Sequence, residues 1–107
     1  MTEMRPIHLA QLGGKTRPAL VLTRSPARSH LSKVTLAPIT STIRGGFTEV
    51  PVGPANGVDH PSVVSVDNVV TVEVTALGRL VGFLLPDQEV ELATAISRAF
   101  DLADPAV

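Results

Sequence analysis

The hydrophobic period of this chain changes once, at Pro86-Asp87, and this change constrains the fold more than any other feature. Before it, short valine-rich segments alternate apolar and polar residues, a pattern typical of β-strands. Glycine and proline clusters separate these segments and indicate turns. After it, apolar residues recur at the spacing of an amphipathic helix. The sequence therefore predicts about five to seven short strands followed by one C-terminal helix.

The strand segments can be placed along the chain. We expect strands at residues 7–12, 17–23, 33–39, 47–52, 62–66, 69–75 and 79–85. The second segment is an unbroken apolar run, which predicts burial on both faces. Pro38 predicts a sheet edge or a bulge near the end of the third. A glycine-driven turn at 12–16 and loops at 25–32, 41–46 and 53–61 connect the strands.

The C-terminal helix is expected to begin at Pro86, with Asp87 as its N-cap and acidic residues in its first turn, near the positive end of the dipole. Five apolar residues share one face at helical spacing: Leu92, Ala95, Ile96, Ala99 and Phe100. A small, strongly bent antiparallel barrel with this helix as a cover is the economical arrangement. The prediction is one mainly β domain over residues 1–107 with a C-terminal helix.

Composition disfavours several classes of function. The chain has three Phe, no Trp and no Tyr, which argues against gripping bases mainly by stacking. A formal net charge of -1 gives no global field that would recruit nucleic acid. Cysteine is absent, the three histidines lack paired metal-ligand spacing, and nucleotide- and dinucleotide-binding fingerprints are missing, so we expect no metal and no cofactor. Without a signal core or a membrane-spanning stretch, the chain reads as soluble and cytoplasmic.

Polar groups stand at the ends of two predicted strands: Arg17 at one, and the hydroxyls of Thr40, Ser41 and Thr42 at the other. Each has an ordinary structural explanation when taken alone. An arginine stem can cover a core, and hydroxyls can cap a turn. Together they suit a phosphodiester, because a guanidinium fork matches phosphate oxygens and adjacent strands can bring both ends to one rim of a barrel.

Acidic residues leave alternatives open. Asp67-Asn68 either forms a turn between strands or presents groups that pair with base edges. Glu73 either faces solvent from the middle of a strand or acts as a general base. Neither choice follows from the local sequence.

Four segments in order carry a family resemblance: 17–22 (R-P-A-L-V-L), 38–41 (P-I-T-S), 47–50 (F-T-E-V) and 62–68 (S-V-V-S-V-D-N). In this order and spacing the chain resembles the MazF/PemK family of toxin endoribonucleases, over about residues 4–100. The resemblance implies the toxin of a type II toxin-antitoxin system. It also implies a small SH3-like antiparallel barrel, the MazF/PemK/CcdB-like toxin fold, which pairs into a homodimer and is neutralised by a cognate antitoxin protein.

The same resemblance implies metal-independent, sequence-specific cleavage of single-stranded RNA, with no action on DNA or membranes expected. The ribose 2′-OH would attack the adjacent phosphate and leave a 2′,3′-cyclic phosphate and a 5′-OH, which inhibits translation and growth. Carried over by position, the catalytic residues are Arg17 and Thr40. The expected RNA-binding residues are Arg5, Lys15, Ser41, Thr42, Arg44, Asp67 and Asn68.

The chemistry of the reaction assigns a role to Arg17 but leaves the general base open. A fixed cation such as Arg17 stabilises the charge of a pentavalent phosphorane, but a guanidinium is a poor base near neutral pH. Glu73, Asp67 or a water molecule remain candidates for the general base. Two other readings stay open: a non-enzymatic toxin of the same fold that binds a protein such as gyrase, and an inactive SH3-like interaction module. Relatives of the first kind lack the Arg-Pro and Thr-Ser pair.

Overall fold

The computed structural model describes residues 4–24 and 30–102. It contains a seven-stranded antiparallel sheet and a C-terminal helix. The strands are β1 (Pro6–Leu12), β2 (Lys15–Val21), β3 (Lys33–Thr40), β4 (Glu49–Val52), β5 (Ser62–Ser65), β6 (Val70–Glu73) and β7 (Leu77–Phe83). Short 3-10 helices lie at η1 (Pro54–Asn56), η2 (Val66–Asn68) and η3 (Val74–Ala76), and α2 spans Pro86–Ala99.

This architecture confirms the prediction of a mainly β fold with a C-terminal helix. The strand pattern located every strand, although β2 and β7 each begin two residues earlier than the sequence indicated. Part of the predicted loop at 25–32 lies outside the described residues. Among the helices that the structure describes, none is both long and apolar enough to cross a membrane.

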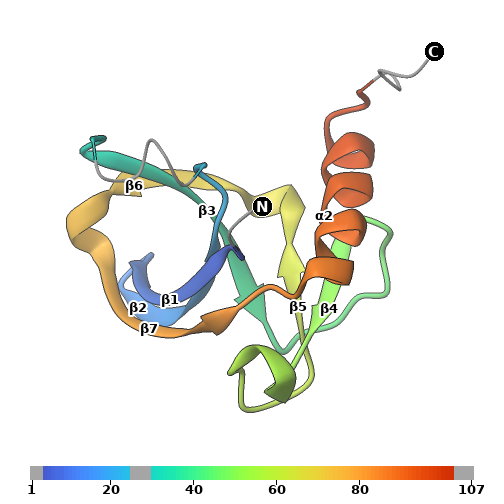
Figure 1. Ribbon diagram of the computed structural model, residues 1–107, viewed down its shortest axis with the longest axis horizontal. Helices are drawn as coiled ribbons and strands as arrows, with labels where there is room; N and C mark the ends of the chain where they lie inside the picture. Colours follow the sequence, from blue (N-terminus) through green and yellow to red (C-terminus); the bar gives the residue numbers. More distant parts are fainter. Residues whose placement is uncertain (1–3, 25–29, 103–107) are drawn as a thin grey trace.

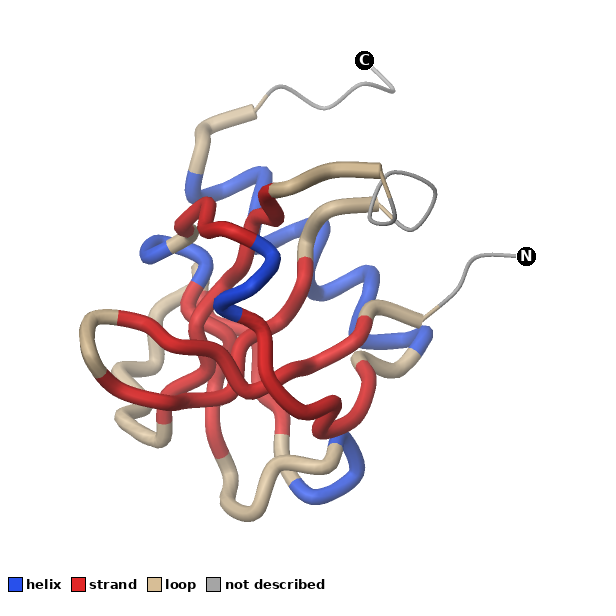
Figure 2. Tube along the Cα trace, turned by 90° about the vertical axis from the view of Figure 1, so that its left-hand side faces the viewer, coloured by secondary structure: helices blue, strands red, loops and turns tan. Residues whose placement is uncertain are grey.

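The sheet is strongly bent, and its strands run in the order β4-β5-β3-β2-β1-β7, with β6 paired to β3. Figure 1 shows β1, β2, β3, β6 and β7 curling round one side, while β4 and β5 stand beside α2 on the other. Figure 2 shows the strands, in red, gathered at the centre of the molecule, with loops and helical segments around them. The described strands form a curved open sheet with β4 and β7 at its ends, so they do not close a barrel.

Strand β3 is the hub of the sheet. It pairs with β2 and, on its other side, with β6 through residues 33–36 and with β5 through Ile39 and Thr40. The predicted sheet edge at Pro38 is therefore wrong, because this proline lies in a central strand. It falls where β3 changes partners from β6 to β5, and a residue without an N–H is tolerated where ladder bonding is interrupted.

Two apolar cores lie on opposite faces of the sheet. Leu20 belongs to the larger core, which also takes in Leu92 and Ala95 of α2. Ala19 and Val21 belong to the smaller core inside the curl of the sheet. Strand β2 is thus buried on both faces, as its unbroken apolar run predicts.

Helix α2 begins one step differently from the sequence prediction. Its N-cap is Leu85, whose backbone N–H donates to the side chain of Gln88 at 2.8 Å, so the assignment of Asp87 as N-cap is wrong. Leu92 and Ala95 are buried, which stabilises the helix by about 1.5–3 kcal/mol for the leucine alone. Phe100, expected on the same face, follows the last helical residue and is 59% exposed.

The loop that contains η1 is held closely against β7. Asn56 is buried, and its side-chain amide donates to the carbonyl oxygen of Phe83 at 2.9 Å and to Gln88 Oε1 at 2.7 Å. Gly57 has φ of +82° and, like Gly82 of β7, leaves no room for a Cβ against the opposing backbone. These contacts fix the position of the loop at 53–61, which lies at the bottom of Figure 1.

Candidate active site

Two clefts meet at Arg17 and Thr40, the two residues common to their linings. The large cleft has a volume of about 580 Å³ and also contains Thr42, Arg44, Gly46, Thr48, Glu49, Ser65, Asp67 and Asn68. The small cleft has a volume of about 350 Å³ and also contains Lys15, Thr16, Ser41, Val58, Asp59, His60 and Ser62. Arg17 and Thr40 therefore stand at the boundary of a surface hollowed on both sides.

The register of the sheet explains why Arg17 and Thr40 meet. Strands β2 and β3 pair with Ala19 opposite Pro38, Leu20 opposite Ala37 and Val21 opposite Leu36. The pairing ends at Ala19 and Pro38, and Arg17 and Thr40 each lie two residues beyond this pair, at the same end of the two strands. Two neighbouring strands, rather than a loop, thus bring both residues to the clefts.

Each of these two side chains retains groups for a ligand. The Thr40 hydroxyl oxygen accepts the backbone N–H of Thr42 at 3.1 Å, so the turn-capping interpretation of this residue is correct in part. Its hydroxyl proton remains able to donate elsewhere. The guanidinium of Arg17 makes no hydrogen bond and no ion pair with any residue in the described part of the chain.

The large cleft is organised by Glu49, at the start of β4. Its carboxylate accepts the backbone N–H groups of Arg44, at 3.2 Å, and of Gly45, at 2.9 Å. Gly45 has φ of +79°, a conformation that glycine adopts without strain. These bonds shape the loop that carries Arg44, one of the predicted RNA-binding residues, into the wall of the cleft.

Asp67 and Asn68 lie in η2 and line the same large cleft as Pro38 and Thr40 of β3. Thr48 Oγ1 donates to Asp67 Oδ2 at 2.6 Å, and Asn68 Nδ2 donates to Ser65 Oγ at 2.7 Å. The 3-10 turn and these two bonds support the structural interpretation of the pair. Both residues also line the cleft, and their pairing with base edges stays a prediction.

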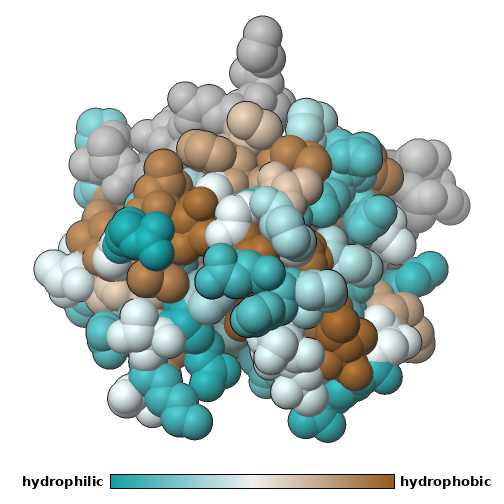
Figure 3. Space-filling model, turned by 90° about the horizontal axis from the view of Figure 1, so that it is seen from below, coloured by the Kyte–Doolittle hydropathy of each residue, from teal (hydrophilic) through white to brown (hydrophobic). Residues whose placement is uncertain are grey.

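The small cleft brings together Lys15 and Ser41, which the sequence suggested, with Asp59 and His60, which it did not. The last two belong to the loop held against β7, far from Arg17 in the sequence. Figure 3 shows polar and apolar side chains interspersed over the face of the molecule seen from below, the side on which this loop lies. The sequence predicted the long loop itself, but no local signal placed it in the same cleft as residues of β2.

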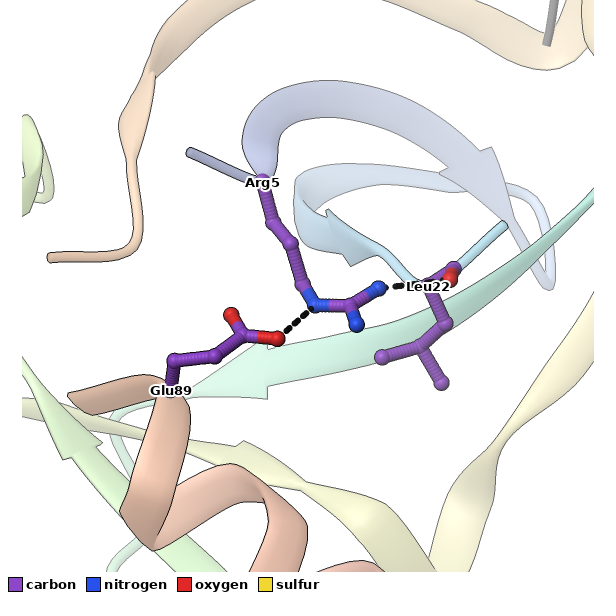
Figure 4. Close-up of polar contacts among 3 residues, drawn as sticks. All are labelled: Arg5, Leu22 and Glu89. Atoms are coloured by element: carbon purple, nitrogen blue, oxygen red, sulfur yellow. Dashed lines mark hydrogen bonds and ion pairs between the residues drawn. The ribbon is translucent and has the colours of Figure 1, made fainter. Parts of the chain in front are cut away.

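The structure does not bring Arg5 to either cleft. Its Nε donates to Glu89 Oε1 of α2 at 2.7 Å, and its Nη1 donates to the carbonyl oxygen of Leu22 at 2.7 Å (Figure 4). A guanidinium with two protein partners is already engaged in holding the start of β1, the end of β2 and α2 together. This geometry favours a structural role over the expected contact with RNA.

Glu73 also lies elsewhere. It is the last residue of β6, opposite Lys33 at the start of β3, whereas Thr40 is at the end of the same strand. Within one chain, Lys33, the partner of Glu73, lies five positions along β3 from Pro38, where this strand reaches the large cleft. It is exposed, which agrees with its solvent-facing interpretation and not with a general base beside Arg17.

The two clefts contain equal numbers of cationic and carboxylate side chains, but two of the carboxylates already accept hydrogen bonds from the protein. Arg17, Arg44 and Lys15 supply the cations, and Glu49, Asp67 and Asp59 supply the carboxylates. Glu49 and Asp67 already accept hydrogen bonds from the protein. No group of three or more His, Cys, Asp or Glu side chains that could hold a metal ion occurs in residues 4–24 and 30–102.

Comparison with known proteins identifies the family of the chain. Residues 4–100 match the family described as the PemK-like, MazF-like toxin of type II toxin-antitoxin systems. The chain is 60% identical over 99 residues to Endoribonuclease MazF3 of Mycobacterium tuberculosis, which covers 92% of this chain and 95% of that protein.

Solved structures give the same result. The Mycobacterium tuberculosis toxin MazF-mt6 is 58% identical and superposes with a TM-score of 0.91, over 94% of this chain and all (100%) of that one. A mycobacterial endoribonuclease in complex with its cognate antitoxin is 26% identical, with a TM-score of 0.84 over 97% of this chain and 100% of that one. The chain therefore belongs to the PemK-like, MazF-like toxin family of type II toxin-antitoxin systems.

Proposed function

We propose that this MazF-family toxin is an endoribonuclease that cuts single-stranded RNA at the boundary between the two clefts, without a metal ion. The observation that carries the proposal is that Arg17 and Thr40 are the two residues shared by the linings of both clefts, just beyond the last β2–β3 pair, Ala19 and Pro38. A phosphate bound there would have nucleotides on either side, each with a cleft to enter. The sequence identity to an endoribonuclease of the same family supports the activity.

Cleavage uses the 2′-OH of the ribose as the nucleophile on the adjacent phosphate. Arg17 donates to the phosphate oxygens and stabilises the charge that develops on the phosphorane. Thr40 donates its hydroxyl proton to the same phosphate and holds it in line with the 2′-oxygen. The products are a 2′,3′-cyclic phosphate and a 5′-OH. DNA is not a substrate, because it lacks the attacking hydroxyl.

Sequence specificity arises from base edges in the clefts. Asp67 accepts from exocyclic amines, and Asn68 both donates and accepts. Arg44, Lys15, Ser41 and Thr42 bind the flanking phosphates or bases from the two cleft walls. Unpaired bases can be splayed into such shallow sites, so the substrate is single-stranded and the recognised sequence is short.

The toxin acts on RNA in the cytoplasm, where cleavage of transcripts stops translation and growth. A cognate antitoxin neutralises it, and two copies of the chain form the active homodimer. A related mycobacterial endoribonuclease forms a complex with its own antitoxin, which supports the first of these assemblies. Exposed apolar side chains on and beside the sheet, including Leu80 and Phe83 of β7, offer surface for the second.

The test is cleavage of a long unstructured RNA in EDTA by the wild-type protein and by Arg17→Ala. We expect discrete cuts with 2′,3′-cyclic phosphate ends, and a rate at least about a hundredfold lower for the variant, since its transition-state donor is lost. Arg79→Ala, which removes an exposed arginine of β7 outside both clefts, is the matched control and should cut within about twofold of wild type.

Two results would contradict the proposal in different ways. Intact RNA after treatment with wild-type protein, across varied sequences, would remove the activity itself. Cleavage that survives in Arg17→Ala, or that requires added Mg²⁺, would leave an endoribonuclease but move its site or its mechanism away from the pair described here.

A further inference from the structure

The small cleft holds a histidine that the ribonuclease reaction does not yet use. His60 lines it together with Arg17 and Thr40, although these residues are far apart in the sequence. Its imidazole is exposed and makes no hydrogen bond to any residue in the described part of the chain. A free imidazole in the cleft that contains the catalytic pair is a group available to a substrate.

The backbone beneath this side chain is fixed. The carbonyl oxygen of His60 accepts the hydroxyl of buried Ser62 at 3.0 Å, and Pro61 lies between them. On the other side, Val58 is buried in the larger core, and Asn56 ties the loop to β7 and α2. The imidazole is therefore presented from a rigid support, as a group that meets a substrate at a defined position must be.

Cleavage of the phosphodiester needs a proton donor for the departing 5′-oxygen. The titratable side chains of the small cleft are Lys15 and Arg17 from β2, and Asp59 and His60 from the loop. Ammonium and guanidinium groups hold their protons well above neutral pH, and carboxylic acids have lost theirs. An imidazolium is the side-chain acid that gives up a proton near neutrality. The chemistry of the cleft thus singles out His60.

We propose that His60 is the general acid of this enzyme, which protonates the 5′-oxygen as it leaves phosphorus. The inference rests on the proposed function and completes it with a residue outside the segments that carry the family resemblance. Arg17 stabilises the phosphorane, Thr40 orients the phosphate, and His60 acts on the leaving group from the small cleft. The nucleotide on the 3′ side of the cut accordingly occupies the small cleft.

The step balances without any co-reactant except water. The 2′-oxygen forms a bond to phosphorus while its proton passes to a water molecule. The bond between phosphorus and the 5′-oxygen breaks while the imidazolium transfers its proton to that oxygen. Solvent then reprotonates His60. The charged side chains that share the small cleft with this imidazole are Lys15, Arg17 and Asp59.

A modified substrate separates this role from others. An RNA whose scissile 5′-oxygen is replaced by sulfur has a leaving group that departs without protonation. We expect His60→Gln to cut ordinary RNA about a hundredfold or more slowly than wild type, and to cut the sulfur substrate at nearly the wild-type rate. Arg17→Ala should remain slow on both. His30→Gln, which changes an exposed histidine outside both clefts, is the matched control.

A pH profile gives a second readout. Wild type should lose activity on ordinary RNA as pH rises and the imidazolium is deprotonated, and His60→Gln should lack this decline. The Kd of His60→Gln for an uncleavable RNA with 2′-deoxyribose at the cut site should be within about threefold of the wild-type Kd, which shows that the variant is folded.

The outcomes are distinct. Wild-type-like cleavage of ordinary RNA by His60→Gln would overturn the proposal, and so would an equal loss on the oxygen and sulfur substrates, because that result marks a role in positioning. If wild type cuts neither substrate, the proposed function fails instead.

Discussion

At the scale of single residues, short hydrogen bonds within the site hold Thr40 and Arg44 in place and leave the Thr40 hydroxyl proton and the Arg44 guanidinium available to a ligand. The hydroxyl oxygen of Thr40 accepts the N–H of Thr42, and the hydroxyl proton stays available to donate. Glu49 uses its carboxylate on the N–H groups of Arg44 and Gly45, so that the Arg44 side chain is left for a ligand. Glu49 is therefore a positioning residue, and it lay outside the residues that sequence reasoning selected.

Glu49→Gln tests this positioning role. An amide accepts more weakly than a carboxylate, so the loop at 44–46 should loosen and Arg44 should bind phosphate less well. We expect KM for a short RNA substrate to rise about three- to tenfold while kcat stays within about twofold. Steady-state kinetics on a fluorogenic RNA will measure both constants.

Glu73→Gln is the matched control for that variant, and it also tests one of the two carboxylate candidates for the general base, the other being Asp67. Because Glu73 lies at the far end of β3 from Thr40, both constants should be unchanged. A fall in kcat of tenfold or more in Glu73→Gln would show that this carboxylate acts in the reaction after all, and would oppose the geometry within one chain.

At the scale of elements, the site is assembled by docking the loop at 53–61 onto β7. No larger residue can replace Gly57 or Gly82 at this contact, because the two backbone segments approach too closely for a Cβ. Asn56 then satisfies the polar groups that the contact buries, with bonds to Phe83 and Gln88. The position of His60 in the small cleft is a consequence of this packing and not of its local sequence.

Gly82→Ala should therefore damage both stability and activity. The added methyl group would meet the backbone of Asn56, so the loop and β7 must separate. We expect the free energy of unfolding in urea to fall by about 2–4 kcal/mol. Gly78→Ala, in the same strand, places its methyl at ordinary contact distance from Leu9 and should cost less than about 1 kcal/mol. Equal losses in the two variants would contradict the close approach.

At the scale of the whole molecule, the two cores and the helix are tied together around the curved sheet. Larger and smaller cores share β2, and α2 closes the larger one. Arg5 adds a polar tie between β1, the residue after β2 and α2 (Figure 4). Its ion pair with Glu89 is partly solvent-exposed, with 28% and 37% of the two side chains accessible, so its contribution is small.

Arg5→Met separates this structural role from the RNA contact that the family resemblance implies. Methionine keeps an unbranched apolar stem but loses the bonds to Glu89 and Leu22. We expect a loss of about 1 kcal/mol in the free energy of unfolding, with KM for RNA unchanged. Urea denaturation and steady-state kinetics will measure the two. A several-fold rise in KM at unchanged stability would restore Arg5 to the RNA-binding surface.

The sequence by itself determined the features that depend on neighbours along the chain. The alternating valine-rich segments predicted the strands, the apolar run at 19–22 predicted a strand buried on both faces, and the change of period at Pro86 predicted the helix. In these cases the information is local, since side-chain period and residue type decide between strand, helix and turn. Arg17 and Thr40 stand at the ends of such segments, and it was the family resemblance that assigned them as catalytic residues.

Tertiary structure alone decided what depends on register and docking. It placed Pro38 in a central strand and the N-cap of α2 at Leu85 instead of Asp87. It also moved Glu73 away from the clefts and brought His60 into one. Strand partners and loop contacts join residues distant in the chain, and each is chosen by the packing of the whole core, so no local pattern of charges or turns could reveal them.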